Sequence, residues 1–489
     1  MARRLVFAAL GLVFLVAACG LALLLALRHP SLEVPKRKAL VISSVTVINP
    51  ELGRRRSRTL VLRGGKIESV RESSPDDEPS PEARSLEGSF ALPGLIDMHA
   101  HHVPSFGIAM YRAWDLLFLA HGVTSIRDVG VQGADVPEPL LEIRSRVRSG
   151  ETPGPRIFTC GPILDGDPPV IPFYRVIRNE SEARETVHRL VDAGVDCIKV
   201  YQNLSADALA GVRAAAAERG VKIAGHLPTA ISYDDAAGLD LQHLVGVGGS
   251  HPYRRFVDQF AGWDEVDESR MDEIVALSVR AGIIHTPTLV MWEQLSHFME
   301  PAWRQRTEFR FLPRSFRQVA WTPEYSPANM RDLTAEDLEA LRRALPKMRE
   351  LTFRLFQAGA RLHAGSDVIM PFVVPGLGLQ QELVQLVEAG LTPERAWLVA
   401  TRWPGEWLGE PGLGTLREGA PADVVFFRED PTRDLRALST LEAVIADGRF
   451  YSRPWLDQAV AEQRAHFEGA LYDSISTWAA RWIVEGLTD

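Results

Sequence analysis

Hydrophobic and polar residues alternate in short runs near both ends of the chain. Between residues 39 and 92, apolar side chains at 41–47 and 60–62 alternate with polar neighbours, as they do in half-buried strands. Short strand-like runs return at the other end, at 419–427 and 441–445, followed by the turn Asp447-Gly448 and the run 449–451. We therefore expect residues 39–92 and 405–453 to form one small composite β-sandwich domain from both flanks of the chain.

The middle of the chain, residues 93–404, alternates strand-like apolar runs with helical stretches such as 183–193 and 206–219. This alternation indicates βαβ units and a parallel sheet. Eight strand candidates follow one another: Leu95–His101, Val123–Val129, Arg156–Gly161, Cys197–Tyr201, Lys222–Leu227, Leu241–Leu244, Ile283–Leu289 and Arg361–Asp367. Eight such units predict an α/β fold of the TIM (β/α)8 barrel type.

The interval between the seventh and eighth strands is long, so residues 290–360 are expected to be an insertion in the barrel. It carries Trp292, Trp303, Trp321 and Tyr325. Two interpretations stay open. These aromatic side chains form a lid or pocket wall over the barrel mouth, or they only anchor the insertion to the surface.

The first 30 residues are expected to lie outside the folded domains. The stretch from Leu5 to Leu27 is 23 residues without a charge, long enough at about 1.5 Å per residue to cross a hydrocarbon layer of about 30 Å. We therefore expect residues 1–30 to be a signal anchor, a transmembrane helix, with a lipoprotein cleaved before Cys19 as the alternative. The protein would be membrane-anchored, with its main domain on the extracytoplasmic side.

The end of the chain, residues 455–489, is predicted to form an amphipathic helix. Its apolar residues recur every three or four positions and form one stripe: Phe467, Leu471, Ile475, Trp478 and Trp482. We expect the stripe to pack against the chain's own domains, with a partner or a membrane surface as the alternative.

Composition and charge exclude several classes of protein. The formal net charge of −9 provides no basic surface, so we expect no nucleic-acid partner. Three cysteines are too few for a disulfide scaffold, and Cys160 and Cys197 are expected to be buried as apolar filler. The absence of a Gly-x-Ser-x-Gly elbow and of a glycine-rich phosphate loop argues against serine hydrolases and nucleotide-dependent enzymes.

Metal-ligating side chains end several of the predicted strands. His99 and His101 close the first strand, where residues two apart point to the same face. Neutral imidazole is a good ligand for zinc and similar metals. Further side chains of this kind end strands four, five, six and eight: Lys199, His226, His243 and Asp367. TIM barrels place their chemistry at this end of the strands, so the sequence predicts a metal site there.

Lys199 can serve in such a site only after modification. Its ammonium has no free lone pair and an ordinary pKa of about 10.4. Between Ile198 and Val200 it would be buried as a charge, which is unfavourable. A carbamate formed with CO2 is negatively charged, and its two oxygens can bridge two metals. An unmodified lysine beside a single metal stays open as the alternative.

The motifs around these residues resemble those of a known family. Pro93-Gly-Leu-Ile-Asp-Met-His-Ala-His101 resembles the signature of the metal-dependent amidohydrolase superfamily, in particular its imidazolonepropionase-like and Xaa-Pro-dipeptidase-like branch. Matching motifs follow in the family's order: Val195–Tyr201, Ala224–Pro228, Gly238–Leu244, Ala364–Asp367, Gly390–Glu394 and Gly419–Asp423. Two positions depart from the pattern, because Gln242 stands where many relatives carry Glu, and Ser366 where Thr is common.

The resemblance implies a centre of two divalent metal ions, with zinc as the first expectation. Its ligands would be His99 and His101 for the first ion, His226 and His243 for the second, carboxylated Lys199 as the bridge, and Asp367 on the first ion. Asp367 would also act as general base and then acid: it takes the proton of a metal-bridging hydroxide as that hydroxide attacks, and delivers it to the leaving nitrogen. Tyr201, two residues beyond the lysine, is a candidate to bind the substrate.

The expected function is therefore metal-dependent hydrolysis of amide bonds in small molecules, with dipeptides or N-acyl amino acids as expected substrates. Whether the chain forms a homo-oligomer is left open. Two alternatives remain: a mononuclear deaminase or cyclic imine or lactam hydrolase, and a non-catalytic binding or assembly module of the same fold.

Overall fold

A computed structural model describes residues 20, 21, 23, 30, 32–102, 110–130, 138–249, 256–324 and 328–486. Within this part of the chain, no helix is both long and apolar enough to cross a bilayer, which takes about 20 predominantly apolar residues. This finding contradicts the predicted transmembrane anchor and the predicted membrane-anchored location. Most of the stretch Leu5–Leu27, including Cys19, lies outside the described residues.

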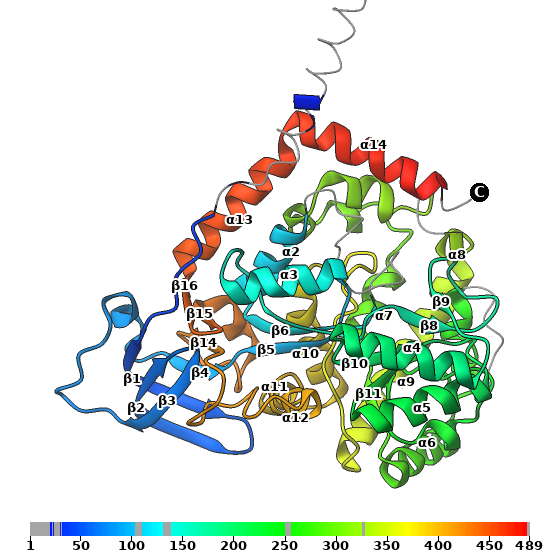
Figure 1. Cartoon of the computed structure of the whole chain (residues 1–489), viewed down its shortest axis with the longest axis horizontal. Helices are drawn as coiled ribbons and strands as arrows, with labels where there is room; N and C mark the ends of the chain where they lie inside the picture. The colour runs from blue at the N-terminus through cyan, green and yellow to red at the C-terminus, as the bar shows by residue number, and fades with distance from the viewer. Residues whose placement is uncertain are drawn as a thin grey trace, which may run out of the picture.

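Strands from the two ends of the chain form one seven-stranded sheet (Figure 1). Its order is β16 (Arg449–Ser452), β15 (Leu441–Ala446), β14 (Val424–Phe427), β4 (Phe90–Pro93), β1 (Leu40–Asn49), β2 (Gly53–Arg63) and β3 (Lys66–Glu72). Strand β4 is parallel to β1 and antiparallel to β14. Apolar side chains from both ends, among them Ile42, Val47 and Phe426, share one core. The predicted β-sandwich is thus a single sheet, because β4 pairs with both of its neighbours.

The middle of the chain forms two parallel sheets. One contains β5 (Leu95–Ala100), β6 (Val123–Asp128) and β7 (Arg156–Thr159). The other has the order β13 (Ile284–Thr286), β12 (Leu239–Gln242), β11 (Lys222–Gly225), β10 (Cys197–Val200), β8 (Ile163–Asp165) and β9 (Arg175–Val176). Almost every residue of β5, β6, β10 and β12 is buried, as in parallel sheets covered on both faces.

The predicted eighth strand, Arg361–Asp367, lies between these two sheets. Leu362 forms an isolated bridge with His285 of β13, and Val368 forms one with Ala100 of β5. The segment makes no longer ladder, and Asp367 has a positive φ of 55° that interrupts an extended strand. Closure of all eight segments into a TIM barrel stays a prediction.

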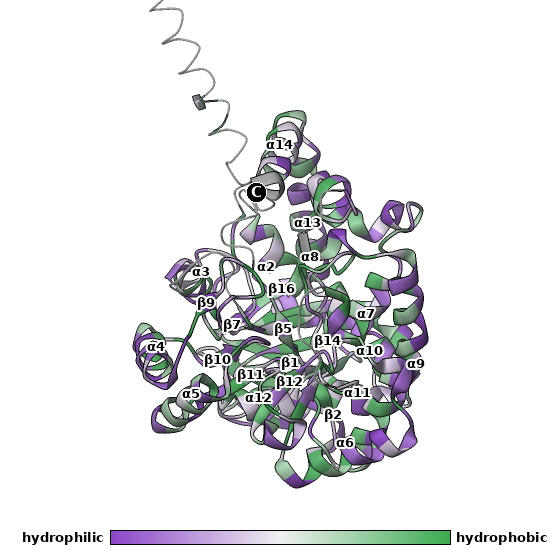
Figure 2. Ribbon diagram, turned by 90° about the vertical axis from the view of Figure 1, so that its right-hand side faces the viewer, coloured by the Kyte–Doolittle hydropathy of each residue, from purple (hydrophilic) through white to green (hydrophobic). Residues whose placement is uncertain are grey.

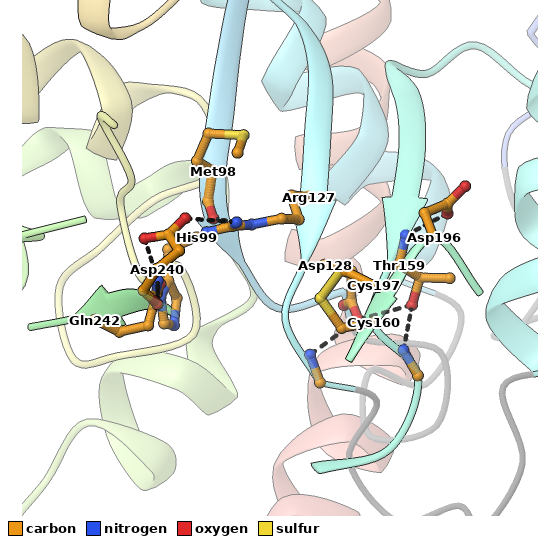
Figure 3. Close-up of a disulfide and its surroundings, with 12 residues drawn as sticks. Met98, His99, Arg127, Asp128, Thr159, Cys160, Asp196, Cys197, Asp240 and Gln242 are labelled. Carbon is orange, nitrogen blue, oxygen red and sulfur yellow. Dashed lines mark hydrogen bonds and ion pairs between the residues drawn. A yellow bond between two sulfur atoms is a disulfide. The ribbon is translucent and has the colours of Figure 1, made fainter. Parts of the chain in front are cut away.

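A disulfide joins the two parallel sheets on the side away from this segment (Figure 3). Cys160, directly after β7, is bonded to Cys197, the first residue of β10, across a sequence separation of 37. Both lie in a buried apolar cluster with Met98 and Trp407. The expectation that they are unbonded filler is therefore wrong, because the fold places the end of β7 beside the start of β10.

Helices lie around the parallel strands (Figure 2). Three of them, α4 (Glu180–Ala193), α5 (Ala206–Arg219) and α6 (Glu268–Ala281), begin at a side-chain cap and end at a glycine in the left-handed conformation. The other helices here are α2 (Tyr111–Ala120), α3 (Glu138–Ser149), α10 (Leu377–Ala389), α11 (Pro393–Val399) and α12 (Arg402–Leu408).

The insertion is mostly helical, with α7 (Leu289–Ser296), α8 (Ala328–Arg331), α9 (Ala335–Gln357) and the short helices η5 (Trp303–Gln305), η6 (Thr307–Phe311) and η7 (Phe316–Ala320). Two of its tryptophans have different roles: one anchors the insertion and the other contacts a residue of the predicted site. Trp321 is buried against Phe309 and anchors the segment, whereas the Trp292 indole donates a hydrogen bond to the His243 carbonyl at 3.2 Å. Tyr325 lies outside the described residues.

The C-terminal region contains two helices where one was predicted. They are α13 (Arg453–Glu468) and α14 (Ala470–Gly486), which meet at an angle at Gly469 (Figure 1). The predicted apolar stripe is divided between them: Phe467 is buried, but Trp478 and Trp482 are 68% and 66% exposed.

Candidate metal centre

The parallel strands carry the predicted site residues at their ends. His99 lies in β5 and His101 follows that strand, while Lys199 lies in β10. His226 and His243 directly follow β11 and β12. His101, His226 and His243 were expected within their strands, but each strand ends one residue before its histidine. All six predicted ligands, Asp367 included, are at most 8% exposed.

Three of these residues form a compact ligand set. The Nε2 atoms of His99 and His101 lie 3.2 Å and 3.3 Å from Oδ1 of Asp367. Their ligand atoms all lie within 4.8 Å of one another. Burial alone would raise the pKa of Asp367, but the neighbouring histidines outweigh it and hold that pKa well below its usual value. Burial lowers the pKa of His99 to about 4, so its imidazole is neutral at pH 7.

The remaining histidines continue the cluster. The ring of His243 lies 4.4 Å from that of His99 and 4.9 Å from that of His226, centroid to centroid. Burial also lowers the pKa of His226 and of His243 well below the usual value. These two imidazoles are therefore neutral as well, which is the form that ligates metals.

Lys199 is buried beside this cluster. Its Nζ atom has no hydrogen-bond partner within the described part of the chain, which is rare for a buried amine. Burial lowers its pKa to about 7, so a substantial fraction is the neutral amine. An amine of this kind can react with CO2, whereas an ammonium cannot.

Each of the four histidines is held through its Nδ1 atom. His99 Nδ1 donates to Oε1 of Gln242, His101 Nδ1 to the Gly130 carbonyl at 3.1 Å, His226 Nδ1 to Oε1 of Gln202 at 3.3 Å, and His243 Nδ1 is hydrogen-bonded to Oγ1 of Thr288 at 2.7 Å. In His99, His101 and His226, where the partner is a carbonyl oxygen, Nε2 is therefore left as the ligand atom, and in His99 and His101 it faces Oδ1 of Asp367. Such partners orient ligating histidines and fix their tautomer, so the residues fit a metal centre.

The backbone around the site is locally strained. His243, Thr288 and Asp367 all have positive φ values, of 61°, 46° and 55°. This conformation is unfavourable for residues with a Cβ and concentrates at functional sites. Gly365 permits the close approach that brings Asp367 to the histidines, because a Cβ there would lie 2.7 Å from the Cβ of His99.

A buried charge network lies behind His99 (Figure 3). Asp240 accepts hydrogen bonds from Arg127 at 2.7 Å and from the Gln242 amide at 2.9 Å, and His363 Nδ1 lies 3.0 Å from it. Arg127 thus pairs with Asp240 and not with the adjacent Asp128. The amide of Gln242 is held so that its oxygen faces His99. Gln242 was visible in the sequence only as a departure from the family pattern, and Gln202 and Thr288 gave no signal at all.

Tyr201, the candidate substrate-binding residue, borders the histidine cluster. Its ring lies 4.1 Å from that of His226 and 5.0 Å from that of Tyr174. With Ile163 these two tyrosines form a small buried cluster. The role of Tyr201 stays a prediction.

Comparison with known proteins agrees with this geometry. The chain belongs to the amidohydrolase family, whose model matches residues 90–450. It is therefore an enzyme, a hydrolase acting on carbon–nitrogen bonds, as the sequence predicted.

Solved structures of low sequence identity share the fold. One is a bottromycin amidohydrolase, 22% identical, with a TM-score of 0.68 over 91% of this chain and 93% of that one. Another is a Xaa-Pro dipeptidase with methionine bound in its active site, 20% identical, with a TM-score of 0.60 over 85% and 100%. Ochratoxinase from A. niger is 18% identical, with a TM-score of 0.59 over 85% and 96%. No match is found among curated proteins.

Proposed function

We propose that this chain hydrolyses amide bonds of dipeptides or N-acyl amino acids with two divalent metal ions, zinc first among them. The observation that carries the proposal is the cluster of four buried histidines, each hydrogen-bonded at Nδ1, with Nε2 of His99 and His101 facing Asp367. The substrate class is supported by the names of similar folds, among them a Xaa-Pro dipeptidase.

The residues divide between two ions as the family resemblance implies. His99, His101 and Asp367 would hold one ion, and His226 and His243 the other. Lys199 would bridge them as a carbamate: its nitrogen forms a bond to the carbon of CO2 and releases a proton. The burial of Nζ without a hydrogen-bond partner supports this modification, because the carbamate oxygens would gain metal ligation where the amine makes no hydrogen bond. Divalent ions in such a centre lower the pKa of a bound water and polarise a carbonyl.

The chain's own groups would handle the proton and the substrate. The Asp367 carboxylate, ionised because of its histidine neighbours, would accept a proton from the attacking water and pass it to the leaving nitrogen. The Tyr201 hydroxyl would donate a hydrogen bond to the substrate carbonyl or carboxylate. Burial of all these side chains excludes bulk water from the reacting groups.

The finer architecture is part of the same proposal. Residues 93–404 would close as a TIM barrel with the insertion 290–360, beside the composite domain of 39–92 and 405–453. The region 455–489 would pack outside both.

The decisive test is Lys199→Ala in the full chain, with Lys222→Ala on the neighbouring strand β11 as the matched control. We expect about two zinc ions per chain for the unaltered protein and for the control, and fewer than one for Lys199→Ala. Hydrolysis of a dipeptide and N-acyl amino acid library should fall with the metal, and a short carboxylic acid such as propionate should restore part of both.

A ratio of one ion per chain in the unaltered protein, with activity kept in Lys199→Ala, would instead indicate a mononuclear enzyme. Full metal content and activity in Lys199→Ala without added acid would refute the bridging role.

A further inference from the structure

Positive charge is concentrated in one part of the insertion, although the whole chain carries −9. Residues 301–320 contain five arginines and a single acidic residue, Glu308. Two of the arginines have acidic partners: Arg306 pairs with Glu308, and Arg314 pairs with Asp473 of α14 at 3.0 Å. The other three have no acidic partner within the described residues.

These three arginines line one cavity of about 420 Å³. Its lining residues lie in or just before η5, in η6 and in η7: Pro301, Arg304, Gln305, Arg310, Arg317 and Gln318. The Nε atom of Arg317 is buried there without a hydrogen-bond partner. Burial lowers the pKa of Arg317, and the nearby charges of Arg310 and Arg314 lower it further. Three guanidinium groups therefore converge with neutral amides and no counter-charge of their own.

The acidic residue that acts on Arg317 does not neutralise this cavity. Glu468 at the end of α13 attracts Arg317, but it is paired with Arg464 at 2.9 Å, and Arg464 in turn repels Arg317. The cavity therefore keeps an excess of positive charge.

Aromatic packing holds the segment that carries these arginines. Phe309, next to Arg310, packs against Trp321 and Phe372 with centroid distances of 5.5 Å and 5.3 Å. Phe316, next to Arg317, lies 5.6 Å from Trp321. Such buried aromatic neighbours hold the arginine backbone in place before any ligand arrives, which lowers the entropic cost of binding.

We propose that this cavity is a binding site for a small dianion, a molecule bearing a phosphate or two carboxylates. Guanidinium groups bind these oxyanions through paired, charge-assisted hydrogen bonds, and the glutamine amides add neutral donors. The volume falls within the range of small-molecule sites, roughly 300–1,000 Å³. The site uses none of the residues of the metal centre and is independent of the proposed function.

Calorimetric titration of the full chain with inorganic phosphate and with succinate, at constant ionic strength, tests this site. We expect saturable binding of at least one of the two, and the tighter one identifies the ligand group. Arg310→Gln and Arg317→Gln should each weaken it at least tenfold. Arg314→Gln is the matched control, because Arg314 already pairs with Asp473, and it should change the affinity less than threefold.

Arg310 is exposed, so Arg310→Gln should fold like the unaltered chain. A loss of anion affinity in this variant can therefore be assigned to the lost guanidinium group. Absence of saturable binding of both anions to the unaltered chain overturns the proposal. Binding that persists in both glutamine variants overturns it as well, because that anion would then occupy the metal centre or another surface.

Discussion

The disulfide between Cys160 and Cys197 should contribute strongly to stability. The perturbation is the double variant Cys160→Ala/Cys197→Ala, which removes the disulfide cross-link between the sheets of β7 and β10. A disulfide restricts the unfolded chain by closing a loop, and the effect grows with the logarithm of loop length. For the sequence separation of 37, the chain-entropy relation gives about 4 kcal/mol.

The same bond lies next to the metal centre. Cys197 and Lys199 are two residues apart in β10, so their side chains point to the same side of the strand. Loss of the link should let the start of β10 move relative to β7 and displace Lys199. We therefore expect the double variant to bind zinc at least tenfold more weakly than the unaltered protein, in addition to its loss of stability.

Guanidinium unfolding with and without a dithiol reductant measures the first effect, and zinc competition with a chelator measures the second. Reductant should lower the unfolding midpoint of the unaltered protein to near that of the double variant. It should leave the variant itself unchanged, which separates loss of the bond from loss of two sulfur atoms. Two results together would refute the reasoning. The unfolding midpoint would not change with reductant, although a thiol assay shows that the disulfide is reduced, and the free energy of unfolding of the double variant would lie within about 1 kcal/mol of that of the unaltered protein.

Three further predictions concern single buried side chains. Asp367→Asn should lower kcat about 10²–10⁴-fold with little change in KM, measured by steady-state kinetics on metal-loaded protein, because the proton acceptor is lost. Gln242→Leu should weaken zinc binding about 10–100-fold in chelator competition, because Nδ1 of His99 loses its acceptor, whereas Gln242→Glu should keep the affinity. Burial raises the pKa of Glu382 from 4.5 to about 8, so the folded chain binds this proton more tightly than the unfolded one. Stability should therefore fall as the pH rises from about 4.5 to 8, by up to about 1.4 kcal/mol per pH unit, and Glu382→Gln should remove this contribution in urea unfolding at a series of pH values.

The sequence predicted those features that depend on local pattern. The strand ends carrying His99, Lys199 and His226 could be placed because apolar runs and turn residues mark them directly. The pairing of Cys160 with Cys197 could not be predicted, because it depends on how β7 and β10 come together in space. For the same reason, nothing in the sequence indicated that Gln202 and Thr288 hold the site histidines.

The C-terminal helices show where a prediction from periodicity fails. The spacing from Phe467 to Trp482 fits one continuous helix, but the chain turns at Gly469 and leaves Trp478 exposed. Periodicity shows which residues share a face only while the helix continues, and here the helix ends at Gly469, whose backbone is extended with φ −62° and ψ 128°.

The seven-stranded sheet has a consequence for how the chain is made. Strand β4 pairs with β1 on one side. Its other edge can pair only after β14 has been synthesised, and β14 lies roughly 330 residues further along the chain. At a synthesis rate of about 5–20 residues per second, that edge stays open on the ribosome for on the order of 20–60 s. An open strand edge readily pairs with other chains, so nascent copies on one messenger are at risk of joining through β4. Completion of this sheet is therefore a late and vulnerable step in biogenesis.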